Sequence, residues 1–304
     1  MSQVFFTETG NRAEGVRAVL GAMGNAAVKN KDVLIKPNFN TADPTPGSTH
    51  KDTLAALIDH LWAAGARSIA LGERSYPPTR EVMEQKGVFP LLEKRQVRVI
   101  DFDDLGEKDW VEFRPPESHW KSGFRVARPI LEAECLVSTC CLKTHQFGGV
   151  FTLSLKLHVG VVPTFRNGFG YMGELHQSAY QQEMIAELNA PFAPDIVLLD
   201  GVEAFVDGGP ATGKRAMGNV FLASSDRVAV DAVGVAMLKH LGSNRDIMGR
   251  RIFDQRQIRR AVELNLGAAS ADAIELLAVD EQSVACRDQI RQMLIQSEKV
   301  DRAG

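Results

Sequence analysis

The sequence predicts an α/β fold with a mainly parallel sheet built from βαβ units. Short apolar runs rich in β-forming residues alternate with helical patterns along the chain. The composition, with 44% hydrophobic and 24% charged residues, is that of an ordinary globular protein. The length of 304 residues is about twice a usual domain of ~150 residues. We expect one α/β domain over residues 1–304, which could divide into lobes at 1–130 and 131–304.

The first predicted βαβ unit lies near the N-terminus. Five apolar runs are predicted strands, at residues 33–36, 68–72, 135–139, 196–200 and 220–224. Between the first two, apolar residues from Leu54 to Trp62 recur at helical spacing. This pattern predicts a helix over residues 51–64, with Ser48 or Thr49 as N-cap and Gly65 as C-cap.

A second unit is predicted near the end of the chain. The run at 220–224 leads into an apolar helical pattern, and Ser224, Ser225 or Asp226 would be the N-cap of that helix. Residues 76–128 contain several prolines and an acidic run without a clean period. We expect this middle region to elaborate the first lobe.

Charge and cysteine usage exclude several classes of protein. The formal net charge is −3, and the arginines of residues 245–260 are expected to form a solvated helix face, so no nucleic-acid partner is predicted. The four cysteines are expected to be buried free thiols, and no iron–sulfur cluster is expected because no CxxCxxC run occurs.

The sequence also bears on the compartment. The first residues lack a secretory signal. The longest apolar stretch, residues 150–162, contains Lys156 and His158 and falls short of the ~20 residues of a membrane span. We therefore expect a cytoplasmic protein without a membrane partner. The oligomeric state stays open, a homo-oligomer included.

Polar residues follow each predicted strand. The segments are Lys36-Pro37-Asn38, Glu73-Arg74-Ser75, Lys143-Thr144-His145, Asp200-Gly201-Val202-Glu203 and Ser224-Ser225-Asp226. In open parallel sheets, ligands bind outside the carboxyl ends of the strands. The sequence therefore predicts one site drawn from several loops.

Three lysines are the predicted anion-binding groups of this site. Pro37 would hold Lys36 in an extended conformation beyond its strand, with Asn38 beside it. Lys143 and Lys156, together with a helix N-terminus in residues 150–158, could neutralise a carboxylate or phosphate. The structural alternatives are that Lys36 is solvated and that Lys156 extends from an apolar helix towards water.

Two histidines are the predicted proton-transfer groups. His145 lies on a loop, where a catalytic role and a simple hydrogen-bonding role are equally open, whereas His158 is expected to pack on its helix. His176 is predicted near the start of a helix over residues 174–189. A divalent metal, if one binds, would use His145, His176, Asp200 and Glu203, but their dispersed spacing leads us to expect no metal site.

A Gly-rich loop follows Asp200. Gly208, Gly209 and Lys214 are expected to contact the substrate, and the loop to form a mobile cover. The loop fails the GxxxxGK[ST] template, which argues against ATP hydrolysis. No GxGxxG follows the first strand, which argues against a dinucleotide site.

Several stretches together resemble one family. They are VLIKPNFN with its Gly-Ser-Thr loop, LIDHLWAAGARSIALGE, CLKTHQFGGVFTLSLKLHVGVVP, His176, DIVLLDGVEAFVDGGPATGK and NVFLASSDRVAVDAVGVAMLKHLG. This collinear set, from about residue 30 to 280, resembles the bacterial and archaeal domain-of-unknown-function 362 proteins.

The resemblance implies a cytoplasmic α/β protein. Some family members carry ferredoxin-like iron–sulfur cysteines, which this chain lacks, and Leu157 stands where members usually have Asn. The positions that match the family are Lys36, Asn38, Lys143, His145, Lys156, His176, Asp200, Gly208, Gly209 and Asp226.

Two functional hypotheses follow. In the first, the chain is an enzyme for a small anionic substrate: the lysines stabilise negative charge, Lys143 among them as a catalytic group, and His145 is the general acid/base, oriented by Asp200. His176 is then a second proton-transfer group. The reaction class stays open between hydrolysis, elimination or isomerisation, and oxidoreduction with a cofactor from a partner. In the second, the same groups bind an acidic metabolite or a partner's cofactor without catalysis.

Overall fold

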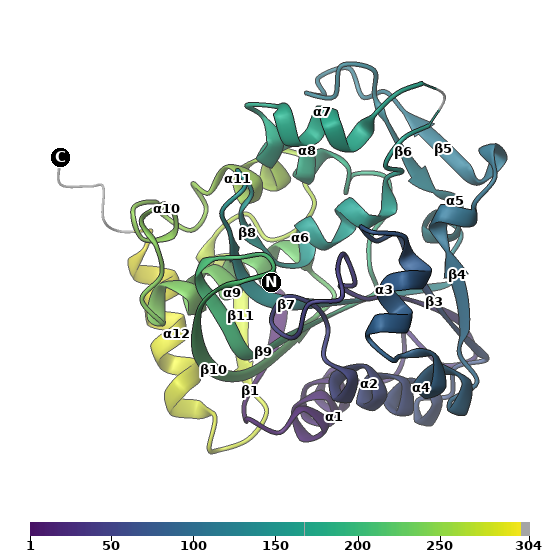
Figure 1. Ribbon diagram of the computed structural model, residues 1–304. Helices are drawn as coiled ribbons and strands as arrows, with labels where there is room; N and C mark the ends of the chain where they lie inside the picture. Colours follow the sequence, from purple (N-terminus) through teal and green to yellow (C-terminus); the bar gives the residue numbers. More distant parts are fainter. Residues whose placement is uncertain (167, 299–304) are drawn as a thin grey trace.

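A central sheet divides the molecule into layers. The computed structural model describes residues 1–166 and 168–298 (Figure 1). Residues 167 and 299–304, which the predicted C-terminal lobe includes, lie outside the described residues. The strands are β1 (Ser2–Glu8), β2 (Asp32–Lys36), β3 (Ser68–Glu73), β4 (Arg98–Asp101), β5 (Trp110–Phe113), β6 (Phe124–Ala127), β7 (Cys135–His145), β8 (Val150–Thr152), β9 (Ile196–Gly208), β10 (Gly213–Ser224) and β11 (Ile274–Ala278).

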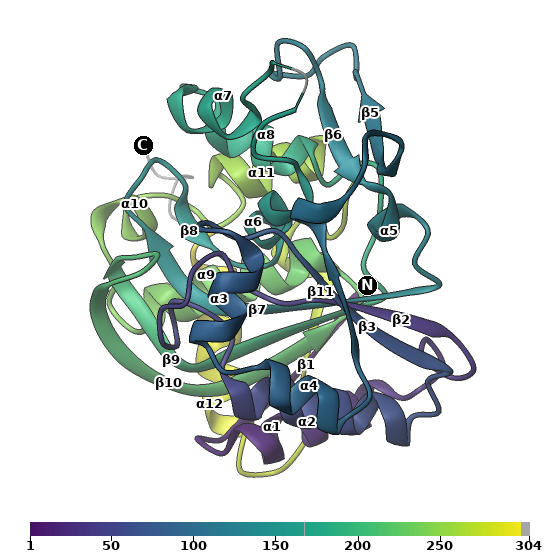
Figure 2. The same cartoon turned by 45° about the vertical axis from the view of Figure 1, so that its right-hand side comes forward.

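Helices pack on both faces of the sheet. They are α1 (Arg12–Met23), α2 (Lys51–Ala63), α3 (Thr79–Gln85), α4 (Phe89–Lys94), α5 (Arg128–Leu131), α6 (Ser154–Leu157), α7 (Tyr171–Gln177), α8 (Gln181–Glu187), α9 (Arg227–His240), α10 (Arg245–Met248), α11 (Arg256–Glu263) and α12 (Val284–Gln296). Figure 2 shows α1, α2 and α4 below the sheet and α8 and α11 above it. The middle of strand β2 is apolar because Val33 and Ile35 enter the core beneath the sheet and Leu34 enters the core above it.

The sheet is mostly parallel, which confirms the predicted fold class. Its order is β11-β1-β10-β9-β7-β2-β3-β4, with β8 paired to the end of β7. Strands β9, β7, β2, β3 and β4 are parallel neighbours, and β1 is parallel to β11. Strands β5 and β6 form a separate antiparallel pair. The carboxyl ends of β2, β3 and β7 therefore meet at one edge, where the site was expected.

The predicted strand at 220–224 runs in the opposite direction. It belongs to β10, which pairs antiparallel with both β9 and β1. Only a tight turn joins β9 to β10, and such a connection cannot cross over the sheet to make a parallel pair. Ser224 and Asp226 therefore lie at the edge opposite the site. Asp226 is the N-cap of α9, as predicted, and accepts hydrogen bonds from the backbone N–H groups of Val228 and Ala229.

Two predicted helices differ in detail from the helices in the structure. The segment predicted as a helix over 150–158 begins as β8, continues as α6, and ends in a 3-10 turn over His158–Val161. The helix predicted over 174–189 is interrupted between α7 and α8. Ser178 there has extended backbone, and its hydroxyl accepts the N–H of Tyr180, which competes with helical hydrogen bonding. The N-cap of α2 is His50, in place of Ser48 or Thr49.

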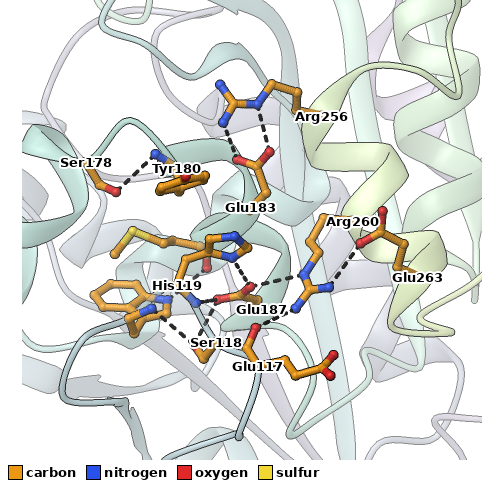
Figure 3. Close-up of polar contacts among 12 residues, drawn as sticks. Glu117, Ser118, His119, Ser178, Tyr180, Glu183, Glu187, Arg256, Arg260 and Glu263 are labelled. Carbon is orange, nitrogen blue, oxygen red and sulfur yellow. Dashed lines mark hydrogen bonds and ion pairs between the residues drawn. The ribbon is translucent and has the colours of Figure 1, made fainter.

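Helix α8 is held by buried acidic residues (Figure 3). The Glu187 carboxylate accepts hydrogen bonds from the Ser118 hydroxyl, from the backbone N–H and Nδ1 of His119, and from Nε of Arg260. Glu183 binds Arg256 through two hydrogen bonds. These arginines of α11 therefore face α8, and the prediction that residues 245–260 form only a solvated face is wrong for them.

Helix α8 in turn supports the residues around the predicted site. Nε2 of Gln182 donates to the Gly148 carbonyl over 3.2 Å. Asn189, just after the helix, donates to the Leu155 carbonyl and contacts Nδ1 of His158, whose Nε2 lies 2.8 Å from the Ser138 hydroxyl. His158 is thus a core histidine, as expected.

Within the described ranges, no helix combines the length and apolar character needed to cross a membrane.

We predict that Glu187→Ala lowers the free energy of unfolding by about 2–4 kcal/mol, because it leaves buried donors and the Arg260 guanidinium without their acceptor. Glu263→Ala is the matched control: this glutamate also binds Arg260 but is half exposed, so the expected loss is under ~0.5 kcal/mol. Urea denaturation followed by circular dichroism measures both. Equal losses in the two variants would contradict a structural role for the Glu187 network.

Candidate functional site

A cavity of about 480 Å³ opens at the carboxyl ends of β2, β3 and β7. Six of the predicted site residues line it: Lys36, Asn38, Lys143, His145, Lys156 and His176. Other lining residues were not among the predicted site residues, and they include Glu73, Arg74, Thr152, Thr164 and Met172. The parallel register brings the strand ends together, and α6 and α7 cover them from above (Figure 2).

Lys36 forms a buried ion pair. Its Nζ lies 2.5 Å from Oε1 of Glu73 and donates to the Pro37 carbonyl over 2.8 Å. Glu73 also accepts the backbone N–H groups of Phe39 and Arg74. Burial raises the pKa of Glu73 and lowers that of Lys36, and the attraction between the partners offsets only part of each shift. The positive charge of Lys36 is therefore already matched inside the protein.

Arg74 adds a second cation to the cavity wall. Its guanidinium donates to the Val159 carbonyl over 2.9 Å and to the Thr164 hydroxyl over 3.2 Å, while its buried Nε has no hydrogen-bond partner. Among the described residues that line the cavity, Glu73 is the one acidic residue, and it forms an ion pair with Lys36. Arg74 therefore forms no ion pair with a carboxylate of the described residues.

Lys143 is the third cation. It lies in β7 opposite Thr152 of β8, and its ammonium donates to the Gly47 carbonyl. Burial lowers the pKa of Lys143, and the attraction of Asp43 offsets only part of this effect. Asn38, which follows β2, is fixed through its backbone N–H by the Thr49 hydroxyl, and its buried Nδ2 has no hydrogen-bond partner. Thr152 likewise has a buried hydroxyl without a partner.

Lys156 lies on α6, whose start is held from another helix. Asp231 of α9 accepts the backbone N–H groups of Ser154 and Leu155 and the Ser154 hydroxyl. This carboxylate does for α6 what an N-cap residue does within a helix. Burial, followed by repulsion from Lys143 and Arg74, lowers the pKa of Lys156 to about 7.

The two predicted histidines both reach the cavity. His145 ends β7, is almost fully buried, and has no hydrogen-bond partner at Nδ1. Burial and the nearby Lys156 and Lys143 lower its pKa to about 2, so the imidazole is neutral at neutral pH. His176 on α7 is exposed at the mouth, and its Nδ1 lies 2.7 Å from the Met172 carbonyl oxygen. Partial burial lowers the pKa of His176 as well.

The Gly-rich segment is the turn between β9 and β10. Gly209 has φ of +69° and lies so close to β7 that a Cβ would be 2.1 Å from the Thr144 carbonyl oxygen. Gly208 also has positive φ, and neither glycine is a lining residue, whereas Pro210 is. Lys214 pairs with Asp207 in the hairpin register, is exposed, and lies outside the cavity lining. In the structure this turn forms part of the cavity wall.

Asp200 and Glu203 lie away from the cavity. The Asp200 carboxylate accepts from Thr53 over 2.6 Å and from Arg12 over 3.1 Å, and it makes no contact with His145. Glu203 binds Arg12 and Arg215. The structure therefore does not bring these two carboxylates together with His145 and His176. Over residues 1–166 and 168–298, no three His, Cys, Asp or Glu side chains are placed to hold a metal ion.

The four cysteines are free, as predicted. Cys135, Cys140 and Cys141 are buried, and Cys286 is partly buried. Burial raises the pKa of Cys135 to about 12 and that of Cys141 to about 11. These thiols are therefore protonated at neutral pH and lie outside the cavity lining.

Comparison with known proteins gives one curated relative and one solved structure to report. The chain is 26% identical to the thylakoid-associated protein sll1697 from Synechocystis sp. over 232 residues, which cover 74% of this chain and 70% of the relative. It is 16% identical to the lactate racemase apoprotein from Thermoanaerobacterium thermosaccharolyticum, with a TM-score of 0.48. That alignment covers 78% of this chain and 57% of the racemase chain.

The family comparison covers the segments that build the cavity. The model of the family described as domain of unknown function (DUF362) matches residues 33–236, which include all six predicted residues of the cavity lining. The match extends over more than half of the chain, and this protein therefore belongs to the DUF362 family.

Proposed function

We propose that this protein is an enzyme that binds a small carboxylate or phosphate in the cavity. One observation carries the proposal: Lys143, Lys156 and Arg74 line the cavity, and its acidic lining residue, Glu73, is already bound to Lys36. Taking a cation out of water without a partner is costly, so a bound anion would relieve that cost. The cavity volume suits a small molecule.

The residues divide into binding and proton-transfer roles in this proposal. Lys143, Lys156 and Arg74 hold the anion and stabilise negative charge that develops on it. Lys36, matched by Glu73, positions the loop after β2 and its Asn38 side chain. His145 accepts or donates a proton at Nδ1, and His176 serves as a second proton-transfer group at the mouth.

A second candidate function is anion binding without catalysis. It is favoured by the low pKa of His145, because a neutral imidazole cannot act as a general acid. A bound anion would raise this pKa by attracting the imidazolium. The two functions therefore differ in what His145 does once the anion has bound.

We predict that Lys143→Met weakens binding of inorganic phosphate or lactate about tenfold to hundredfold, because one charge-assisted hydrogen bond is lost. Lys214→Met removes an exposed lysine outside the cavity and should change affinity less than about twofold. Isothermal titration calorimetry measures both, with thermal melts to verify folding. If neither anion binds the wild type, or if both variants weaken binding equally, the proposed site is wrong.

We predict that His145→Gln and His176→Gln keep anion affinity but lower turnover about hundredfold, because each removes a proton-transfer group. Consumption of a panel of small carboxylates and phosphate monoesters, followed by NMR, gives the turnover. If the wild type binds a panel member and none is consumed, the binding function replaces the enzymatic one.

We predict that Gly149→Ala abolishes anion binding with the fold retained. A Cβ at this position would lie 2.6 Å from Cε of Lys156 and 3.1 Å from Nδ1 of His145, so the methyl group must displace them. Gly173→Ala is the control, because Gly173 lines the cavity but a Cβ there meets nothing within 4 Å. Calorimetric titration with phosphate tests the pair, and equal affinities in the two variants would refute the placement of the anion.

A further inference from the structure

The amine of Lys156 differs from the other cavity lysines in having no partner. Lys36 is paired with Glu73, and Lys143 donates to the Gly47 carbonyl. In the part of the chain that the structure describes, Lys156 makes no hydrogen bond or ion pair, although its side chain is almost fully buried in the cavity wall. An unengaged, buried amine facing a cavity is available to react with what the cavity holds.

The groups around Lys156 suit a reaction of its amine. A Cβ on Gly149 would touch both Cε of Lys156 and Nδ1 of His145, so the end of the Lys156 side chain and the imidazole border the same small space. Nδ1 of His145 has no partner in the structure and is free to exchange a proton there. Beside them, Lys143 and Arg74 supply the positive charge that would hold a carboxylate.

We propose that Lys156 forms an imine with the carbonyl carbon of a small 2-oxo acid, whose carboxylate lies against Lys143 and Arg74. This inference rests on the proposed function and names its substrate class. Lysine amines form such adducts when a desolvated pocket or a neighbouring cation keeps them neutral. Leu157, Val159 and Met172 line the cavity and would contact the apolar remainder of the acid.

The proposed step is balanced without an oxidant or a reductant. The neutral amine attacks the carbonyl carbon, a C–N bond forms, and His145 carries a proton from the nitrogen to the carbonyl oxygen to give a neutral carbinolamine. A second proton, taken from solvent, is added to the hydroxyl group, the C–O bond breaks, and one water leaves. The product is a protonated imine, which withdraws electrons from the neighbouring carbon of the side chain and so assists loss of a proton from that carbon.

Burial, and after it the charged groups around the amine, determine how the charge of Lys156 depends on pH. Lys143 of β7 and Arg74 after β3 repel its protonated form, and His145 and His176 face it from β7 and α7. Asp231 approaches α6 at its first turn, where it binds Ser154. With a pKa of about 7, the amine is mostly protonated at pH 6 and mostly neutral at pH 8.

The test is reductive trapping of the full chain with pyruvate and borohydride. We expect one adduct, with the mass of pyruvic acid less one oxygen atom, on the peptide that contains Lys156. Lys156→Arg keeps the positive charge but cannot form the adduct, and should lose at least about nine tenths of the trapping. Lys214→Arg, which removes an exposed lysine, should trap as the wild type does.

A change of pH separates covalent from purely electrostatic binding. The amount trapped in a fixed time should rise about fivefold to tenfold from pH 6 to pH 8, because the neutral amine is the nucleophile. Lactate has a hydroxyl group in place of the 2-oxo group and cannot form an imine. Its affinity should therefore fall from pH 6 to pH 8, because Lys156 loses its positive charge over this range.

The outcomes distinguish this inference from the proposed function. If pyruvate binds saturably and requires Lys143, but borohydride leaves no adduct on Lys156, the imine is wrong and the anion site stands. Adducts spread evenly over exposed lysines would also refute the imine. If pyruvate, lactate and phosphate all fail to bind, the proposed function fails as well.

Discussion

The constraint on which the site depends is an excess of buried positive charge. Lysines and an arginine from three neighbouring strand ends and from α6 face one cavity, and the structure pairs only Lys36 with a carboxylate there. Each buried ion costs several kcal/mol of hydration free energy unless partners replace the water. Backbone carbonyls partly do this for Lys143 and Arg74. For Lys156, burial and then repulsion from Lys143 and Arg74 lower the pKa to about 7, so the amine loses its proton near neutral pH.

The surrounding fold is organised to hold these cations in place. Apolar residues alternate between two cores along β2, so the strand cannot shift in register without moving hydrophobic side chains out of a core. On the other side of the cavity, Asp231 holds the start of α6. Asn189, just after α8, donates to the Leu155 carbonyl of α6 and contacts His158. The cations are thus supported by packed elements on both of these sides of the cavity.

Much of this arrangement can be predicted from the sequence, and particular residues show where prediction stops. Lys36, Lys143 and His145 were grouped correctly in one cavity because apolar runs identify buried strands and parallel strands end at one edge. Asp200 was misplaced because Asp and Gly commonly follow a strand, whereas here Gly201 lies inside the long strand β9. The direction of β10 depends on a turn whose geometry the residue pattern does not determine. Arg74 was placed at a strand end but was given no role, and Thr152 was missed as a site residue because the residue pattern does not show that β8 pairs with β7.

The cavity draws its walls from a long span of the chain. Lys36 stands near the beginning of that span, and Pro210 in the turn between β9 and β10 stands near its end. Cleaving the backbone anywhere between them would leave neither fragment with a complete cavity, so ligand capture would return only on reassociation of the pieces. The connection between β11 and α12 lies beyond this span, and new chain ends introduced there by circular permutation would leave the cavity walls uninterrupted.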